Sequence, residues 1–115
     1  MARRLLTEKN KTPLEKARLK ALIAEATVDA YGESEQRTGF YTTLDDHLNV
    51  PFATTILGVT VIVERVDMIE DDQIVAICRR GRSRQAVPIL ELPLPTPRPA
   101  GAEWIDAYRL WSRPR

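Results

Sequence analysis

The stretch that decides the fold is Thr54-Thr-Ile-Leu-Gly-Val-Thr-Val-Ile-Val-Glu-Arg-Val66, in which β-branched residues stand on both sides of Gly58. Val59, Val61 and Val63 alternate with other residues, as they do in a strand that buries one face. The stretch therefore predicts one bent strand or two strands, and it marks the start of a sheet.

The sheet is expected to continue toward the C-terminus through short strands with tight links. The pattern predicts an acidic loop at Asp67–Gln73, a buried strand at Ile74–Arg79, a basic turn around Gly81 at Arg80–Arg84, and another strand at Ala86–Leu90. Residues Thr54–Leu90 would form a small antiparallel sheet or an SH3-like barrel. If Ile74–Arg79 pairs with the preceding strand, the acidic loop and the basic turn lie at opposite ends of it.

Two helices are expected before the sheet. Thr12-Pro-Leu-Glu15 has the spacing of a capping box, with proline at the first helical position. The apolar residues that follow recur at helical spacing: Leu14, Ala17, Leu19, Leu22, Ile23 and Ala26. Ser34 is the expected cap of a second helix, which Asn49-Val-Pro-Phe52 ends and whose apolar residues are Phe40, Tyr41, Leu44 and Leu48.

The C-terminal part is expected to close the core with an aromatic helix. Prolines at every second position from Pro93 to Pro99 remove backbone donors, so that stretch should be extended and cannot be a central strand. After Gly101, Trp104, Ala107, Tyr108 and Trp111 recur at helical spacing. The predicted class is α+β, with a flexible tail over residues 1–11 and a single domain over residues 12–115.

Composition and motifs exclude several classes of protein. Hydrophobic residues make up 43% and charged residues 29%, and no apolar run has the length of a membrane span or a secretory signal. One cysteine, Cys78, allows no internal disulfide, which fits the cytoplasm. His47 is the single histidine, and the glycines and serines form no phosphate loop, dinucleotide fingerprint or nucleophile elbow. We therefore expect a protein without catalytic activity.

Two charge clusters could carry a function. The acidic stretch from Glu64 to Asp72 suits a hard cation such as calcium, or it is a solvated hairpin loop without the EF-hand pattern. The basic turn, with Arg79, Arg80, Arg82 and Arg84, could hold phosphates. A net charge of +1 and the absence of aromatic residues among these arginines do not favour binding of nucleic acid.

Several segments resemble one known family. They are Val28-Asp-Ala-Tyr-Gly-Glu-Ser-Glu-Gln36, Gly39-Phe-Tyr41, Leu44-Asp-Asp46, Leu48, Pro51-Phe52, Ile56-Leu-Gly-Val59, Ala76-Ile-Cys-Arg-Arg80 and Gly101-Ala-Glu-Trp-Ile-Asp-Ala-Tyr-Arg109. Across roughly residues 25 to 111, the chain resembles the bacterial calcium-binding protein family typified by the cyanobacterial protein CcbP. The resemblance implies a small cytoplasmic protein, without EF-hands, that buffers or senses calcium through surface carboxylates.

The resemblance also implies a set of metal-binding acids. By position they are Asp29, Glu33, Glu35, Asp45 and Asp46, together with the loop acids Glu70, Asp71 and Asp72. Asp29, Glu33 and Glu35 could equally stabilise the positive end of the second helix. Asp45 and Asp46 are preferred, because a helix that ends near them would let both face one ion at a terminus that attracts cations.

The competing hypothesis is an interaction module. In it, the SH3-like barrel, the basic turn or the aromatic helix docks a protein or a nucleic acid, and calcium binding has been lost. The sequence identifies no protein partner.

Overall fold

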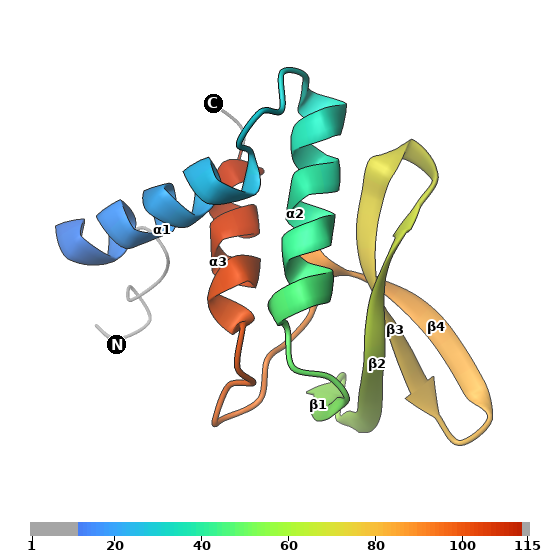
Figure 1. The fold of residues 1–115 in the computed structure, drawn as a ribbon. Coiled ribbons are helices and arrows are strands. Elements are labelled where there is room, and N and C mark those ends of the chain that lie inside the picture. Colours follow the sequence, from blue (N-terminus) through green and yellow to red (C-terminus); the bar gives the residue numbers. More distant parts are fainter. Residues whose placement is uncertain (1–11, 114–115) are drawn as a thin grey trace.

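The computed structural model describes residues 12–113, and the tail expected over residues 1–11 lies outside this range. Along the described chain the helices α1 and α2 precede a four-stranded sheet, and a last helix, α3, follows it (Figure 1). The predicted α+β class is confirmed. The elements are α1 Pro13–Ala26, α2 Glu33–His47, β1 Phe52–Ile56, β2 Val59–Ile69, η3 Glu70–Asp72, β3 Gln73–Arg80, β4 Ser83–Pro88, η4 Ile89–Glu91 and α3 Ala102–Trp111, where η marks a single 3-10 turn.

The sheet is an antiparallel meander in the order β1-β2-β3-β4. Among the described residues, ladders join β1 to β2, β2 to β3 and β3 to β4, so the open sheet, rather than the SH3-like barrel, describes this region. Leu57 and Gly58 form the two-residue turn between β1 and β2, and both have positive φ angles, of 50° and 78°. The stretch from Thr54 to Val66 is thus two strands rather than one.

Several predicted boundaries in the sheet are wrong. The last strand ends at Pro88 and not at Leu90, because Ile89–Glu91 form the turn η4. The acidic loop does not begin at Asp67, because Asp67 pairs with Val75 and β2 continues to Ile69. The last strand begins at Ser83 and not at Ala86, because Ser83 pairs with Arg80 directly across the Gly81 turn. At Asp67 and at Ser83 the partner strand extends the ladder beyond the residues whose own side chains favour a strand.

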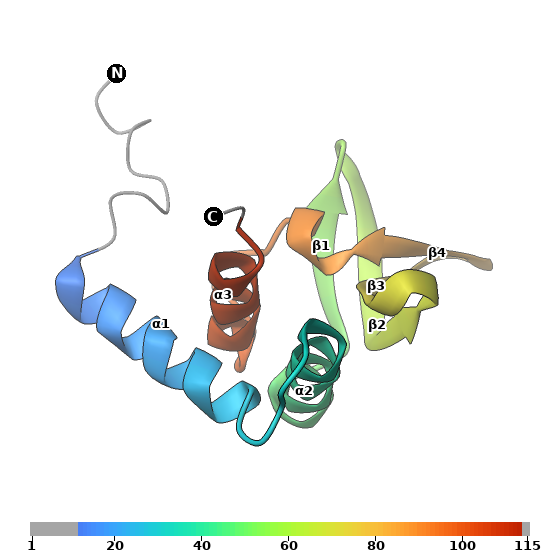
Figure 2. The ribbon, with the colours of Figure 1, turned by 90° about the horizontal axis from the view of Figure 1, so that it is seen from above.

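The helix α1 begins as predicted but packs over less of its length. Thr12 Oγ1 accepts a hydrogen bond from the Glu15 backbone N–H at 3.1 Å, and Glu15 Oε1 accepts one from the Thr12 N–H at 2.9 Å, so the capping box is confirmed. Leu19 and Ala26 are buried, whereas the side chain of Leu14 is 81% exposed and Ala17 is exposed as well. The first half of α1 extends beyond α3 (Figure 2), so the predicted apolar stripe is wrong there.

The helix α2 is capped differently from the prediction. Its N-cap is Gly32, not Ser34, and Glu35 Oε1 accepts hydrogen bonds from the backbone N–H groups of Tyr31 and Gly32 at 2.8 and 3.2 Å. The side chain of Glu35 thus supplies acceptors for the orphan donors that precede the helix. Ser34 is left free to make a tertiary contact.

The core lies between the helices and one face of the sheet. Seen from the front, α2 stands between α3 and the strands β2 to β4 (Figure 1), and α1 lies on the side of α3 away from the sheet (Figure 2). Phe40 of α2 contacts Tyr108 and Trp111 of α3, with ring centroids 5.2 and 5.3 Å apart. The expected closing aromatic helix is confirmed. Beneath these rings Val63, Ile74 and Ala76 bring the sheet into the same buried cluster.

Candidate functional site

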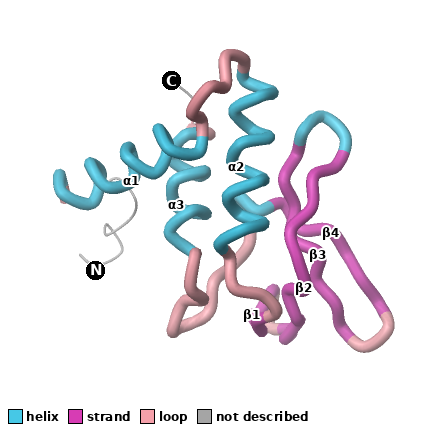
Figure 3. The backbone as a smooth tube through the Cα atoms, in the orientation of Figure 1, coloured by secondary structure: helices cyan, strands magenta, loops and turns pink. Residues whose placement is uncertain are grey.

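The eight acids expected to bind metal fall in three places on the described chain. Asp29, Glu33 and Glu35 lie between α1 and α2 or in the first turn of α2, and Asp45 and Asp46 lie in its last turn. Glu70, Asp71 and Asp72 form η3, at the tip of the β2–β3 hairpin; we call these three residues the acidic tip. Figure 3 shows this tip at one end of the sheet and the β3–β4 turn at the other, as predicted.

The acidic tip has an unusual backbone. Asp71 and Asp72 both have positive φ angles, of 62° and 58°. Aspartate tolerates this left-handed conformation better than most residues, at a cost of roughly 1–2 kcal/mol per residue for an L-amino acid. The conformation turns the chain within three residues, so three consecutive acidic residues occupy one hairpin end.

The tip is tied to the start of α2 by one side-chain hydrogen bond. Ser34 Oγ donates to Asp72 Oδ2 at 2.7 Å, which joins residues 38 positions apart in the sequence. Glu33 is the neighbour of Ser34 in the same helical turn, and its Oε2 lies 3.9 Å from Arg37 Nη2. Among residues 12–113, the ion pairs do not include Glu70, Asp71 or Asp72. Their negative charge is therefore not offset by a paired cation of the described chain.

The last turn of α2 holds the second acidic place. Asp45 and Asp46 are both exposed, and α2 ends at His47, as the preference for these two residues required. Asp45 and Arg65 of β2 line a hollow of about 20 Å³ between the helix and the strand. A positively charged residue and Asp45 thus line the same small space.

Asp67 belongs to the environment of Asp45, although the sequence predicted it to be in a loop. Arg65 Nη2 lies 3.8 Å from Asp67 Oδ2 on β2. Burial raises the pKa of Tyr41 above its ordinary value, the charges of Asp45 and Asp67 raise it further, and Arg65 opposes them. The alternation of polar Arg65 and Asp67 with apolar Val66 and Met68 is the signal that could have placed Asp67 on a strand.

The remaining predicted acids have other partners or stand alone. Glu35 caps α2 through Oε1, which is the structural role that the sequence left open for it. Asp29 is exposed and has a φ angle of 60° in the turn between α1 and α2. Ser34, which the sequence predicted only as a cap, is the residue that connects two of the acidic places.

The three places do not merge into one centre. Within residues 12–113, no three side chains of histidine, cysteine, aspartate or glutamate gather closely enough to hold one metal ion together. The donor set nonetheless fits calcium in its chemistry, because hard cations take carboxylate and carbonyl oxygens, and several positions can be filled by water. The helices of the same range include none that is long and apolar enough to span a membrane.

The fold and these clusters define a small α+β protein whose surface carboxylates suit a hard cation. The chain belongs to the CcbP calcium-binding family, because the sequence model of that family, described as calcium binding, matches residues 20–112. The predicted resemblance is thereby confirmed, and the match includes all eight acids. The family is described by the binding of an ion and not by an enzymatic activity. No curated protein and no solved structure matches the chain.

Proposed function

We propose that this chain binds calcium reversibly through surface carboxylates, without catalysis, and serves as a calcium buffer or sensor in the cytoplasm. The observation that carries the proposal is the family match over residues 20–112. The acidic tip joins two strands, whereas an EF-hand loop joins two helices, so the proposed site is not an EF-hand. A buried, unpaired Cys78 fits a reducing compartment.

We place the ion at the acidic tip, and two opposing effects decide this choice. The positive end of α2 lies nearby, and a helix dipole disfavours a cation by about 0.3–1 kcal/mol. A unit charge 4 Å from a surface carboxylate gains about 1–4 kcal/mol, and calcium carries two charges. The attraction of even one or two carboxylates of the tip therefore outweighs the dipole, and water would complete the coordination of the ion. Ser34 and Asp72 hold the tip against α2, which limits the entropy lost when an ion orders it.

The last turn of α2 is the weaker location, although its dipole favours a cation. Successive side chains on a helix point about 100° apart, so Asp45 and Asp46 diverge. Asp45 is the one that lines the hollow with Arg65, whose positive charge repels an incoming ion. An ion at this place would bind next to the positive charge of Arg65, which is paired with Asp67.

Binding at the tip acts on the protein through charge. Without the ion, the negative charges of three consecutive acidic residues repel one another at a turn in which Asp71 and Asp72 have positive φ angles. A bound ion neutralises this repulsion, and a ligand that binds only the folded state stabilises it by mass action. For a dissociation constant on the order of 10⁻⁵ M, 1 mM calcium adds about 2.7 kcal/mol to the free energy of unfolding.

The experiment is a calorimetric titration of metal-stripped protein with calcium, and with magnesium for comparison. We expect saturable calcium binding that is lost in Glu70→Gln/Asp71→Asn/Asp72→Asn and kept in Asp45→Asn/Asp46→Asn. Glu91→Gln, which removes an exposed carboxylate on η4, is the matched control. The melting temperature of the wild type should rise by about 10 °C in 1 mM calcium.

Other results would move or remove the site. Binding that survives in the tip variant and disappears in Asp45→Asn/Asp46→Asn would place the ion at the last turn of α2. If millimolar calcium produces no heat of binding and no thermal shift, this chain has kept the fold of the family without its activity.

A further inference from the structure

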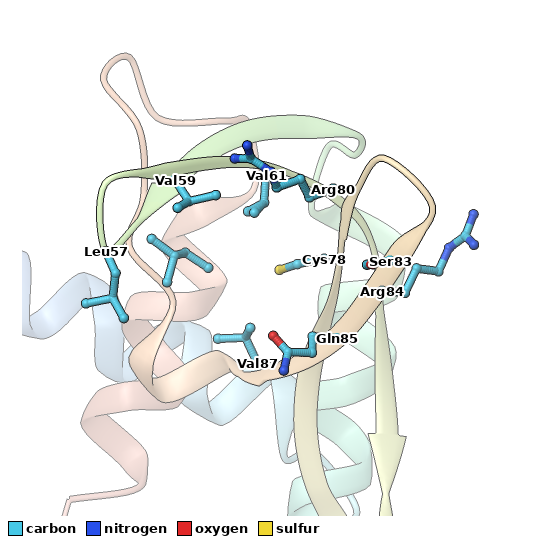
Figure 4. A pocket seen from close by; sticks show the side chains of 10 residues that line it. Leu57, Val59, Val61, Cys78, Arg80, Ser83, Arg84, Gln85 and Val87 are labelled. Carbon is cyan, nitrogen blue, oxygen red and sulfur yellow. The ribbon is translucent and has the colours of Figure 1, made fainter.

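The inner face of the sheet continues beyond the helices into an apolar hollow (Figure 4). The hollow has a volume of about 580 Å³, and it lies between the β1–β2 turn and the β3–β4 hairpin. Side chains from all four strands or their turns line it, and Figure 4 shows those of β2, β3 and β4 converging on one space. Its apolar wall includes Leu57, Val59, Val61, Cys78 and Val87. The cation Arg80 also lines it.

Leu57 is in conflict with its local structure. It occupies the first position of a two-residue turn that requires positive φ at both residues, where asparagine followed by glycine is preferred. A leucine there is strained, and its side chain is also 97% exposed. One exposed leucine needs no explanation, but a strained one at the mouth of an apolar hollow does. The neighbouring Val59 is 38% exposed and extends the apolar wall.

The rim of the hollow is positively charged. Arg79 and Arg84 share one carboxylate, that of Glu64, with N–O distances of 2.7 and 2.8 Å. Arg80 and Arg82 are exposed, and no ion pair within residues 12–113 includes either of them. Within the described chain, Arg80 thus lines the hollow without a paired carboxylate, and Arg82 adds a second unpaired positive charge in the adjacent β3–β4 turn.

We propose that this hollow docks a segment of a partner protein in which an apolar side chain is flanked by aspartate or glutamate. The apolar residue enters the hollow beside Leu57 and Val59, and the acids pair with Arg80 and Arg82. Charge complementarity favours this partner, because its apolar residue would pack against the apolar wall and its acids would pair with the arginines. The site lies at the opposite end of β3 from the acidic tip, and it goes beyond the proposed binding of calcium.

Other occupants fit less well. The chain's own first eleven residues carry Arg3, Arg4, Lys9 and Lys11 against Glu8, so the rim repels them. A small amphiphile needs a site that encloses roughly 70–90% of its surface. This hollow is open to solvent, because Leu57 at its mouth is almost fully exposed. A nucleic acid would pair with the arginines and leave the apolar wall unused.

A selection from random peptides tests the proposal without presuming a partner. Twelve-residue peptides displayed on phage are selected on the wild-type protein, after depletion on the Leu57→Asn/Arg80→Glu variant. We expect the surviving peptides to contain an apolar residue flanked by acids. Their affinity, measured by fluorescence anisotropy, should fall at least tenfold in Leu57→Asn and in Arg80→Glu.

Two matched variants and a stability measurement control for damage to the fold. Leu14→Asn and Arg18→Glu change exposed residues of α1, away from the sheet, and should leave affinity within twofold of wild type. Leu57→Asn should melt at the same temperature as the wild type or higher, since asparagine suits positive φ. Loss of binding in a variant that is no less stable cannot be attributed to misfolding.

Four outcomes would overturn the proposal. In the first, no peptide survives the depletion; in the second, the survivors lack acids or bind Leu57→Asn as tightly as wild type. In the third, sedimentation shows self-association that Leu57→Asn abolishes, which would make a second copy the occupant. In the fourth, a single-stranded oligonucleotide binds in a manner that depends on Arg80 and not on Leu57, which would make the rim a phosphate site.

Discussion

Glu64 holds together the outer side of the β3–β4 hairpin. Its Oε2 accepts a hydrogen bond from Arg79 Nε, and its Oε1 accepts one from Arg84 Nε. The hydrogen bonds from Arg84 and then Arg79 hold the pKa of Glu64 below its ordinary value of 4.5. Since the group lies at the surface, solvent screens these interactions and their contribution to stability is small.

The first prediction concerns Glu64 and acid. Because its folded-state pKa is depressed, its contribution to stability is complete above about pH 4.5 and is lost as pH falls through the folded pKa. Glu64→Gln should therefore lower the melting temperature at pH 7, and the difference from wild type should shrink as the pH falls below 4.5 and through the folded pKa. Thermal scans across this range measure it. Glu91→Gln should show no such convergence, and a constant difference for Glu64→Gln would contradict the assignment.

The second prediction concerns Cys78. Burial raises the pKa of its thiol above the ordinary 9.0, so the folded protein keeps it protonated and shielded. Alkylation by iodoacetamide at pH 8 should be at least about tenfold slower in the native protein than in urea. Mass spectrometry over time gives both rates. Equal rates would mean that the hollow admits solvent to the sulfur.

Gly39 permits the closest approach between two helices. A Cβ atom at this position would overlap the carbonyl oxygen of Ala26, at the end of α1. From the sequence alone the glycine only weakens the predicted second helix, by about 1 kcal/mol relative to alanine. The structure supplies the reason for a glycine there, because α1 crosses α2 at this point.

The third prediction is that Gly39→Ala destabilises the protein. Alanine gains about 1 kcal/mol in helix propensity, but forcing an atom into a packed contact costs about 1–3 kcal/mol. Because the obstacle is backbone, we expect a net loss of about 1–2 kcal/mol in the free energy of unfolding. Urea titration measures it. Thr42→Ala, on the exposed side of α2, should stay within about 0.5 kcal/mol of wild type.

The elements differ in how far the sequence predicts them. The start of α1 and the helix after Gly101 follow from local capping and from periodicity, and both were predicted. The cap of α2 and the end of β2 depend on tertiary contacts. Ser34 bonds to Asp72 instead of capping, and Asp67 joins the ladder because Val75 lies opposite. One-dimensional patterns do not contain such pairings.

At the scale of the whole molecule, β3 separates two oppositely charged ends. The acidic tip lies just before Gln73, the first residue of β3, and the basic turn begins at Arg80, its last residue. The two ends are therefore about 23 Å apart along the strand. The sequence predicted this polarity from the order of the charges. It did not predict the hollow, because the hollow depends on how far α2 and α3 reach across the sheet.

The fourth prediction is that the two ends act independently. Their separation exceeds the Debye length of about 8 Å at physiological ionic strength, so the arginines have little effect on a cation at the tip. Arg80→Glu/Arg82→Glu should change the calcium dissociation constant by less than about twofold in 0.15 M salt. Titration calorimetry measures it. A larger change that persists in high salt would indicate a conformational connection along β3.

The placement of α3 has a consequence for synthesis of the chain. Trp104, Ile105 and Tyr108 are buried against residues encoded more than fifty positions earlier, such as Phe40 and Leu44. While the ribosome is still making the sheet, those earlier aromatic and aliphatic side chains have nothing to cover them. The nascent chain must keep an apolar helix surface exposed until α3 emerges, and during that interval we expect it to be prone to aggregation.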